Sequence, residues 1–381
     1  MSDMLGFRRS RTFLPVLVLS LAPAALFPPA APAAPAAGQP GPGVVTGERP
    51  AAEEAGAVLT RRTAIRRTDN RTTYRAIAAT TPPPAVSLAT WAVADLDTGR
   101  ILAAHGQHVR RQPASTLKLL TSLTAARRVP AEPAHRVTWA EAHPEFCICV
   151  GLDVGQRYAR DSLMAAMLLP SANDAAEAMA GSDRRGRTAF LRAMNRRAER
   201  LGMTRTRAIN PHGLTAYGAS STARDLLVLL RAAQADAVVA PFLGMRTASF
   251  GPLGRETRTI TRSNSYIDRF RRAEGKTGYT SAAGYNLVVA HPVRDALGNV
   301  RRIGVAALGA PSRDASNRSV AALVRWTAAH RHLLRPLGAL PAAPGPVVSR
   351  QSRWVAAQPP TGAPEPAESG EGDAAAESLA G

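Results

Sequence analysis

The folded part of this chain is limited by its two ends, which lack the residues that build a hydrophobic core. Residues 37–84 are rich in Ala, Pro, Gly, Thr and Arg, and residues 339–381 are rich in Pro, Ala, Gly and Glu. Such segments bury too little apolar surface to offset the entropy lost on folding. We therefore predict a linker over residues 37–84, a disordered tail over residues 339–381, and one domain over residues 85–338.

Residues 1–36 have the organisation of a secretory signal peptide. Three arginines within residues 8–11 precede an apolar run over residues 13–27, and Ala-Pro-Ala sites follow within residues 31–36. The run is short for a membrane span, which needs about 20 apolar residues. We expect export to the periplasm or cell wall, by general secretion rather than the twin-arginine route. An uncleaved N-terminus that holds the protein at the membrane is the alternative.

The net charge of +20 comes from basic residues scattered as pairs, such as Arg61-Arg62 and Arg301-Arg302. No zinc-finger spacing, basic zipper or RNA-binding aromatic motif accompanies them, so we predict no nucleic-acid partner. A solvated positive surface is the simplest interpretation. Electrostatic contact with anionic envelope polymers or a membrane surface is the alternative.

Cys147 and Cys149 are the only cysteines of the chain. On a strand both would point to one face. A disulfide between them would close a small ring, and two thiols alone cannot complete a zinc site. We predict a structural role for both, either as thiols or as a disulfide formed after export. The sequence calls for no metal and no organic cofactor.

The pattern inside residues 85–338 is mixed, with strands at both ends and helices between them. Residues 117–126 form an almost wholly apolar helix, which should therefore be buried. Asp161 can cap a further helix that Pro170 ends. We expect the other strands and helices over residues 88–95, 101–104, 285–291 and 303–308 (strands) and 174–180, 187–201, 222–233 and 316–334 (helices). These elements predict an α+β fold, with one antiparallel sheet flanked by helices.

Only two of the 48 basic residues are lysines, Lys118 and Lys276. Arginine stays protonated in proteins, whereas the pKa of a desolvated lysine can fall until it acts as a base. Because the chain uses arginine at every other basic position, the two lysines indicate sites where a side chain that can lose its proton is needed.

Lys118 lies in Ser115-Thr116-Leu117-Lys118. If Ser115 begins the buried helix, residues 115 and 118 lie on one face a turn apart. A neutral Lys118 could then take the proton of the Ser115 hydroxyl. The free N–H groups of a helix start would favour the negative charge that develops. A serine there is more often an N-cap, so this pair alone is a weak signal.

Two further tripeptides add polar groups. Lys276-Thr277-Gly278 begins a predicted edge strand, where Lys276 and Thr277 could bind a carboxylate and Gly278 could let a substrate backbone approach. Ser171-Ala172-Asn173 follows Pro170 and could bring a hydroxyl and an amide from a loop between helices. The order Ser-x-x-Lys, Ser-x-Asn, Lys-Thr-Gly is the signature of penicillin-binding proteins and class A β-lactamases.

The chain resembles the low-molecular-mass penicillin-binding proteins, which are serine-type D-alanyl-D-alanine carboxypeptidases of the DD-peptidase/β-lactamase fold. Besides the three motifs, the resemblance rests on residues 95–100, 168–176, 210–214, 221–226 and 276–280 and covers about 85–335. It implies a hydrolase that trims terminal D-alanine from peptidoglycan stem peptides, with β-lactams as covalent inhibitors.

The resemblance also implies a role for each site residue. Ser115 would be the acylated nucleophile and Lys118 its base, while Ser171 and Asn173 would assist proton transfer and hold the substrate amide. Lys276, Thr277, Gly278 and Tyr279 would line the substrate side of the cleft. The backbone N–H groups of Ser115 and Tyr279 would form the oxyanion hole. The segment Ala273-Glu274-Gly275 departs from the family, because an apolar residue more often precedes the strand lysine.

Three alternatives stay open at this point. A class A β-lactamase would need a Glu-x-x-x-Asn loop between the second and third motifs, and we find none; Glu177 and Glu199 lie on predicted helices. A DD-endopeptidase of the same family is a closer alternative. A non-catalytic penicillin- or envelope-binding protein is the third, although all motif residues are intact.

Overall fold

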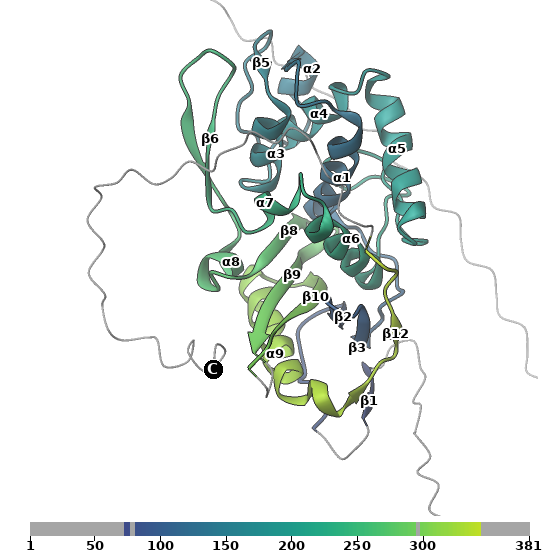
Figure 1. Cartoon of the computed structure of the whole chain (residues 1–381). Helices are drawn as coiled ribbons and strands as arrows, with labels where there is room; N and C mark the ends of the chain where they lie inside the picture. Colours follow the sequence, from purple (N-terminus) through teal and green to yellow (C-terminus); the bar gives the residue numbers. More distant parts are fainter. Residues whose placement is uncertain (1–71, 77–80, 295–297, 344–381) are drawn as a thin grey trace, which may run out of the picture. The chain divides into compact units, whose positions relative to one another are not determined.

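The computed structural model describes residues 72–76, 81–294 and 298–343 (Figure 1). The predicted signal peptide over residues 1–36 lies outside these residues. None of the helices described there is both long and apolar enough to cross a membrane.

The centre of the fold is an eight-stranded antiparallel sheet. Seven strands follow the order β11-β1-β3-β2-β10-β9-β8, and β12 pairs with β3. The long neighbouring strands β9 and β10 pair over most of their length, and β8 is an edge strand. The strands are β1 (Thr72–Ala76), β2 (Thr90–Asp95), β3 (Arg100–His105), β8 (Glu274–Thr280), β9 (Gly284–Arg294), β10 (Val300–Ala310), β11 (Leu334–Arg335) and β12 (Gly338–Ala339).

Helices cover both faces of this sheet, and most of them lie on one side (Figure 1). Two small hairpins, β4 with β5 and β6 with β7, stand apart from it. The helices are η1 (Ala114–Leu117), α1 (Lys118–Arg128), α2 (Trp139–Ala142), α3 (Arg160–Leu168), α4 (Asn173–Gly181), α5 (Gly186–Arg200), α6 (Ala223–Ala235), α7 (Ala240–Leu243), α8 (Ser265–Arg269), α9 (Arg313–His330) and η2 (Arg331–Leu333). The hairpin strands are β4 (His135–Arg136), β5 (Arg157–Tyr158), β6 (Thr247–Phe250) and β7 (Arg258–Thr261).

Strand alternation divides the interior into two cores. Trp91 and Val93 of β2 pack in the core that contains α9, whereas Ala92 and Ala94 pack in the core that contains α1 and α3–α6. Successive strand residues point to opposite faces, so a central strand of a sheet that is covered on both sides is buried at every position. All six residues of β2 are accordingly buried. The predicted α+β fold with helices on an antiparallel sheet is confirmed.

The predicted elements agree with the structure apart from four local differences. The helix predicted over residues 316–334 ends at His330, and Leu334 belongs to strand β11. Strand β1 lies inside the range predicted as a linker, because it pairs with β3 and β11 although its own sequence is not strongly apolar. Strand β12 and the buried Leu340 likewise extend the fold into the range predicted as a tail. The N-cap of α3 is Ala159 rather than Asp161, whose carboxylate instead accepts a hydrogen bond from Arg160.

Candidate active site

Ser115 and Lys118 lie one helical turn apart, as their spacing predicts. Ser115 belongs to the short 3₁₀ turn η1, and Lys118 is the first residue of α1. The Lys118 Nζ atom lies 2.9 Å from the Ser115 Oγ atom, and the Lys118 side chain is completely buried. Helix α1 packs against α3, α4, α5 and α6. This agrees with its sequence, because a helix that is apolar on all sides is stable only in the interior.

Lys118 has three oxygen neighbours, and none of them is a carboxylate. Besides Ser115, its amine donates to Asn173 Oδ1 at 2.7 Å and to the His212 carbonyl at 3.2 Å. Burial lowers the pKa of Lys118 well below its ordinary value, and the charge of Lys276 lowers it further; Asp174 opposes the shift. A neutral amine fits these neighbours, since its two N–H groups serve the two carbonyl oxygens and its lone pair faces the Ser115 hydroxyl.

Lys276 and Ser171 form a second pair beside the first. The Lys276 Nζ atom lies 2.9 Å from Ser171 Oγ and donates to the Thr277 carbonyl at 3.0 Å. Burial, with a smaller contribution from the buried Arg262 guanidinium, lowers the pKa of Lys276 to about 7. The structure thus brings residues from η1, the α3–α4 loop and β8 to one place.

The backbone is strained at Ser171 and directly before Ser115. Ser171 has φ +71°, and Ala114, directly before Ser115, has φ +48°. Non-glycine residues in this left-handed region cost of order 1–3 kcal/mol each and are concentrated at functional sites. The strained turn at Ala114 is closely packed. Gly213 (φ +85°) lies so near that a Cβ atom on residue 213 would clash with the Ala114 carbonyl.

Strand β8 passes very close to the turn that carries Ser115. A Cβ atom on Gly278 would lie 2.8 Å from the Ser115 nitrogen and 2.9 Å from the Thr116 nitrogen. The sequence assigned this glycine to substrate approach, and the structure adds a packing reason for glycine here, because a Cβ atom would meet the protein's own backbone. The neighbouring Tyr279 is half exposed, and its ring packs on Tyr285 at 4.3 Å between centroids.

The predicted residues surround one surface pocket. It is lined by residues from η1, the α2–β5, α3–α4 and β7–α8 loops, strands β8 and β9 and the start of α9: Ser115, Ile148, Ser171, Ser263, Thr277, Gly278, Tyr279, Tyr285, Asn286, Leu287, Arg313, Ser316 and Asn317. The buried amines of Lys118 and Lys276 lie behind the two serines. No Asp or Glu is among the described residues that line this pocket.

Sequence reasoning missed Asn286 on β9, which ties the Ser115 turn to the sheet. Its amide nitrogen donates to the carbonyls of Gln112 and Pro113, and its oxygen accepts from the Gly309 N–H. An asparagine within a buried strand is an unusual residue, and this was the only signal available.

A second missed group holds the carbonyl that Lys118 uses. His212 lies 3.1 Å from Glu177, and Arg187 bonds both oxygens of the same carboxylate. The Leu214 N–H donates to His212 Nδ1, so the hydrogen of the neutral ring is on Nε2 and points to Glu177. Burial lowers the pKa of His212. Although burial opposes it, hydrogen bonding to Arg187 and His212 lowers the pKa of Glu177 to about 2. The Glu177 carboxylate is therefore already bonded to two partners within the protein, Arg187 and His212.

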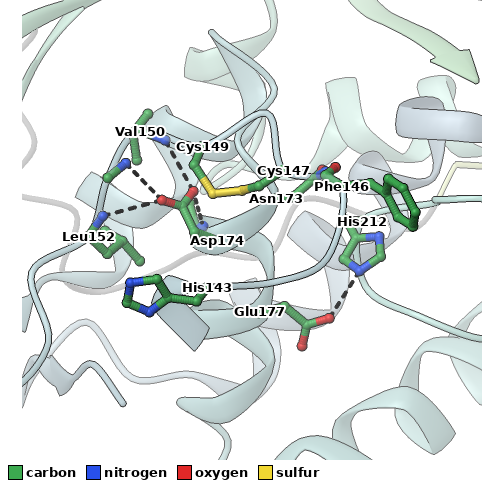
Figure 2. The surroundings of a disulfide bond; sticks show 12 residues. His143, Phe146, Cys147, Cys149, Val150, Leu152, Asn173, Asp174, Glu177 and His212 are labelled. Carbon is green, nitrogen blue, oxygen red and sulfur yellow. Dashed lines mark hydrogen bonds and ion pairs between the residues drawn. A yellow bond between two sulfur atoms is a disulfide. The ribbon is translucent and has the colours of Figure 1, made fainter. Parts of the chain in front are cut away.

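Cys147 and Cys149 form a disulfide on a loop, rather than on a strand, at the edge of the site (Figure 2). Together with Asp174 they place three metal-type ligand atoms within 4.8 Å of one another. The sulfur atoms are joined to each other, however, and the Asp174 carboxylate accepts N–H groups from Val150, Gly151 and Leu152. This group therefore does not fit a metal ion.

Comparison with known proteins gives one consistent result. The D-alanyl-D-alanine carboxypeptidase family, peptidase S11, matches residues 77–310. The carboxypeptidase DacB2 of Mycobacterium tuberculosis is 38% identical over 209 residues, which are 54% of this chain and 71% of that protein. The carboxypeptidase DacD of Escherichia coli is 30% identical over 259 residues, 64% of each protein, so this chain spans somewhat less than two thirds of its length.

Solved structures agree with these relatives. A crystal structure of a D-alanyl-D-alanine carboxypeptidase from M. tuberculosis matches with a TM-score of 0.62 and 33% identity, covering 69% of this chain and 98% of that one. Penicillin-binding protein 6B of E. coli matches with a TM-score of 0.56 and 29% identity over 65% of this chain and 78% of its own. The chain belongs to the D-alanyl-D-alanine carboxypeptidase family.

Proposed function

We propose that Ser115 is the nucleophile with which this enzyme removes the terminal D-alanine of peptidoglycan stem peptides. The observation that carries the proposal is a completely buried lysine amine, 2.9 Å from a pocket-lining serine and without a carboxylate partner among its hydrogen bonds. An amine held neutral in this way is a base at neutral pH.

The reaction is an acyl transfer in two steps. Lys118 takes the hydroxyl proton while Ser115 Oγ attacks the carbonyl carbon of the penultimate D-alanine. The oxyanion accepts hydrogen bonds from the backbone N–H groups of Ser115 and Tyr279. The proton passes to the departing amine, with Ser171 assisting, and free D-alanine leaves. Water then attacks the ester and gives a proton to Lys118, which passes it to the departing Ser115 Oγ as the shortened peptide leaves.

The remaining motif residues bind the substrate. Lys276 and Thr277 offer a cation and a hydroxyl to the terminal carboxylate of the peptide. Asn173 holds the substrate amide and Lys118 together. A β-lactam would acylate Ser115 in the same way and stay bound, because the described part of the pocket contains no carboxylate to activate water. Family membership supports peptidoglycan peptides as substrates and β-lactams as ligands.

We also propose where the protein acts and where its fold begins. The N-terminal pattern supports export through a signal peptide over residues 1–36, with action in the periplasm or cell wall. Because β1 and β12 pair within the main sheet, the catalytic domain extends beyond residues 85–338 to include residues 72–76 and 339–340. The surplus positive charge supports contact with anionic envelope polymers.

Covalent labelling by fluorescent penicillin tests the proposal. We expect the wild-type chain to take up one stoichiometric, long-lived label, and Ser115→Ala to take up none while it remains folded. On peptide substrates we expect free D-alanine from a pentapeptide in preference to cleavage of a cross-linked dimer. Dimer cleavage alone would favour an endopeptidase, the name carried by an E. coli relative that is 29% identical. Absence of label would leave only a binding role.

The charge of Lys276 should appear in the pH profile of D-alanine release. The pKa of Lys276 is about 7, so its amine is charged below that pH and neutral above it. We therefore expect kcat/KM to fall as pH rises through about 7. Lys276→Arg keeps its charge at every pH that can be tested, so the falling limb should disappear.

A matched exchange serves as the control. Arg272→Lys alters an exposed side chain at the approach to β8 and should leave the profile unchanged. A falling limb that stays near pH 7 in Lys276→Arg would show that another group titrates there.

A further inference from the structure

We propose that the disulfide-closed loop Phe146–Cys149 is a positioning element, which fixes the amide of Asn173 and thereby the amine of Lys118. The inference rests on the proposed role of Ser115 and Lys118. It assigns a function in the reaction to a backbone carbonyl and to a disulfide that lie outside the three sequence motifs.

Asn173 is held from two sides. Its Oδ1 atom accepts from the Lys118 amine, and its Nδ2 atom donates to the Phe146 carbonyl at 3.2 Å. Its backbone N–H also donates to the Ile148 carbonyl at 2.7 Å. A flipped amide would face N–H groups toward the Lys118 amine and an oxygen toward the Phe146 carbonyl, and both contacts would be repulsive. The Phe146 carbonyl therefore selects the amide orientation that Lys118 needs.

The loop is not held in place by burial of its own side chains. Phe146 is 87% exposed, Ile148 is 61% exposed, and both cysteines are exposed. Phe146 has φ +49°, a conformation that a bulky residue adopts only when its surroundings enforce it. The Cys147–Cys149 bond supplies one constraint directly after Phe146.

Asp174 supplies the second constraint, on the other side of the disulfide. This buried carboxylate accepts N–H groups from Val150, Gly151 and Leu152 (Figure 2). Asp174 follows Asn173 at the start of α4, so the same helix end anchors the loop and presents the amide. No carboxylate among the described residues holds the segment before the cysteines in the same way, and the disulfide adds a covalent constraint there to the hydrogen bond between Asn173 and the Phe146 carbonyl.

The loop also reaches the reacting groups directly. Ile148, between the two cysteines, lines the pocket together with Ser115 and Thr277. A change in loop geometry would therefore be felt both at the Asn173 amide and at the wall of the pocket. Small displacements of aligned groups can reduce a reaction rate by a large factor.

Reduction of the wild-type protein provides the test. A water-soluble phosphine gives two electrons to the disulfide, water supplies the two protons and the oxygen, and the products are two thiols and a phosphine oxide. The two cysteines are the only ones in the chain. After anaerobic removal of the phosphine, we expect the acylation rate constant for fluorescent penicillin to fall about tenfold. The dissociation constant of the initial complex and the thermal midpoint should change little, and reoxidation should restore the rate.

Two variants accompany this test. Cys147→Ser/Cys149→Ser should show the low rate permanently and should not respond to the phosphine. Glu145→Gln alters an exposed side chain directly before the loop and leaves the loop carbonyls and the disulfide in place, so it should acylate at the wild-type rate.

Several results would overturn the inference. These are an unchanged acylation rate after reduction, a tenfold loss in oxidised Glu145→Gln, or a rate loss that merely follows a large fall in the thermal midpoint. Labelling of neither redox state would instead contradict the proposed function, and this inference with it.

Discussion

Lys118→Arg is expected to acylate Ser115 about 10²- to 10⁴-fold more slowly than the wild-type enzyme, the range that a positioned general base contributes. The substitution keeps a positive charge, but a guanidinium cannot release its proton in a protein and cannot accept one from Ser115. Lys118 is completely buried and burial is the main cause that lowers its pKa, which favours loss of the amine proton, whereas arginine keeps its proton. Stopped-flow labelling with fluorescent penicillin measures the rate constant.

Two controls separate proton transfer from folding. Arg127→Lys makes the reverse exchange at an exposed position of the same helix and should leave the rate unchanged. Lys118→Met keeps an unbranched side chain without a charge or a basic nitrogen, so it should fold and yet acylate slowly. Near-native acylation by Lys118→Arg would exclude a neutral-lysine base.

The parts of the site that the sequence could predict are those that depend on local geometry. Ser115 and Lys118 meet because residues three apart share a helix face, wherever the helix packs. Their enclosure was also predictable, since an almost wholly apolar segment has no surface to present to water. The sequence also predicted an edge strand at Lys276, and this lysine lies in the edge strand β8.

Other parts depend on partners that lie far away along the chain. Strand β1 forms because β3 and β11 offer unpaired edges, and a Pro/Ala-rich sequence gives no sign of such partners. Asn286 reaches the carbonyls of Gln112 and Pro113 across more than 170 positions. The contact of Phe146 with Asn173 is made by a backbone carbonyl, which leaves no trace in residue identity.

Gly278→Ala should lower the acylation rate by about 10²- to 10³-fold, comparable to the loss of one oxyanion donor. The new Cβ atom would lie 2.8 Å from the Ser115 nitrogen, 2.9 Å from the Thr116 nitrogen and 3.0 Å from the Ala114 side chain. Two of these three atoms are backbone and cannot rotate away. Either the turn Ala114–Leu117 or strand β8 must move, and either movement separates the Ser115 N–H group from that of Tyr279.

The matched control is Gly338→Ala, on another strand of the same sheet. A Cβ atom there meets nothing within 4 Å, so the rate and the thermal midpoint should stay at wild-type values. Because Gly278→Ala displaces reacting groups rather than a binding surface, its effect should fall on the acylation rate constant more than on the dissociation constant of the first complex. Equal acylation by both alanine variants would mean that the spacing between β8 and the Ser115 turn does not set the reaction geometry.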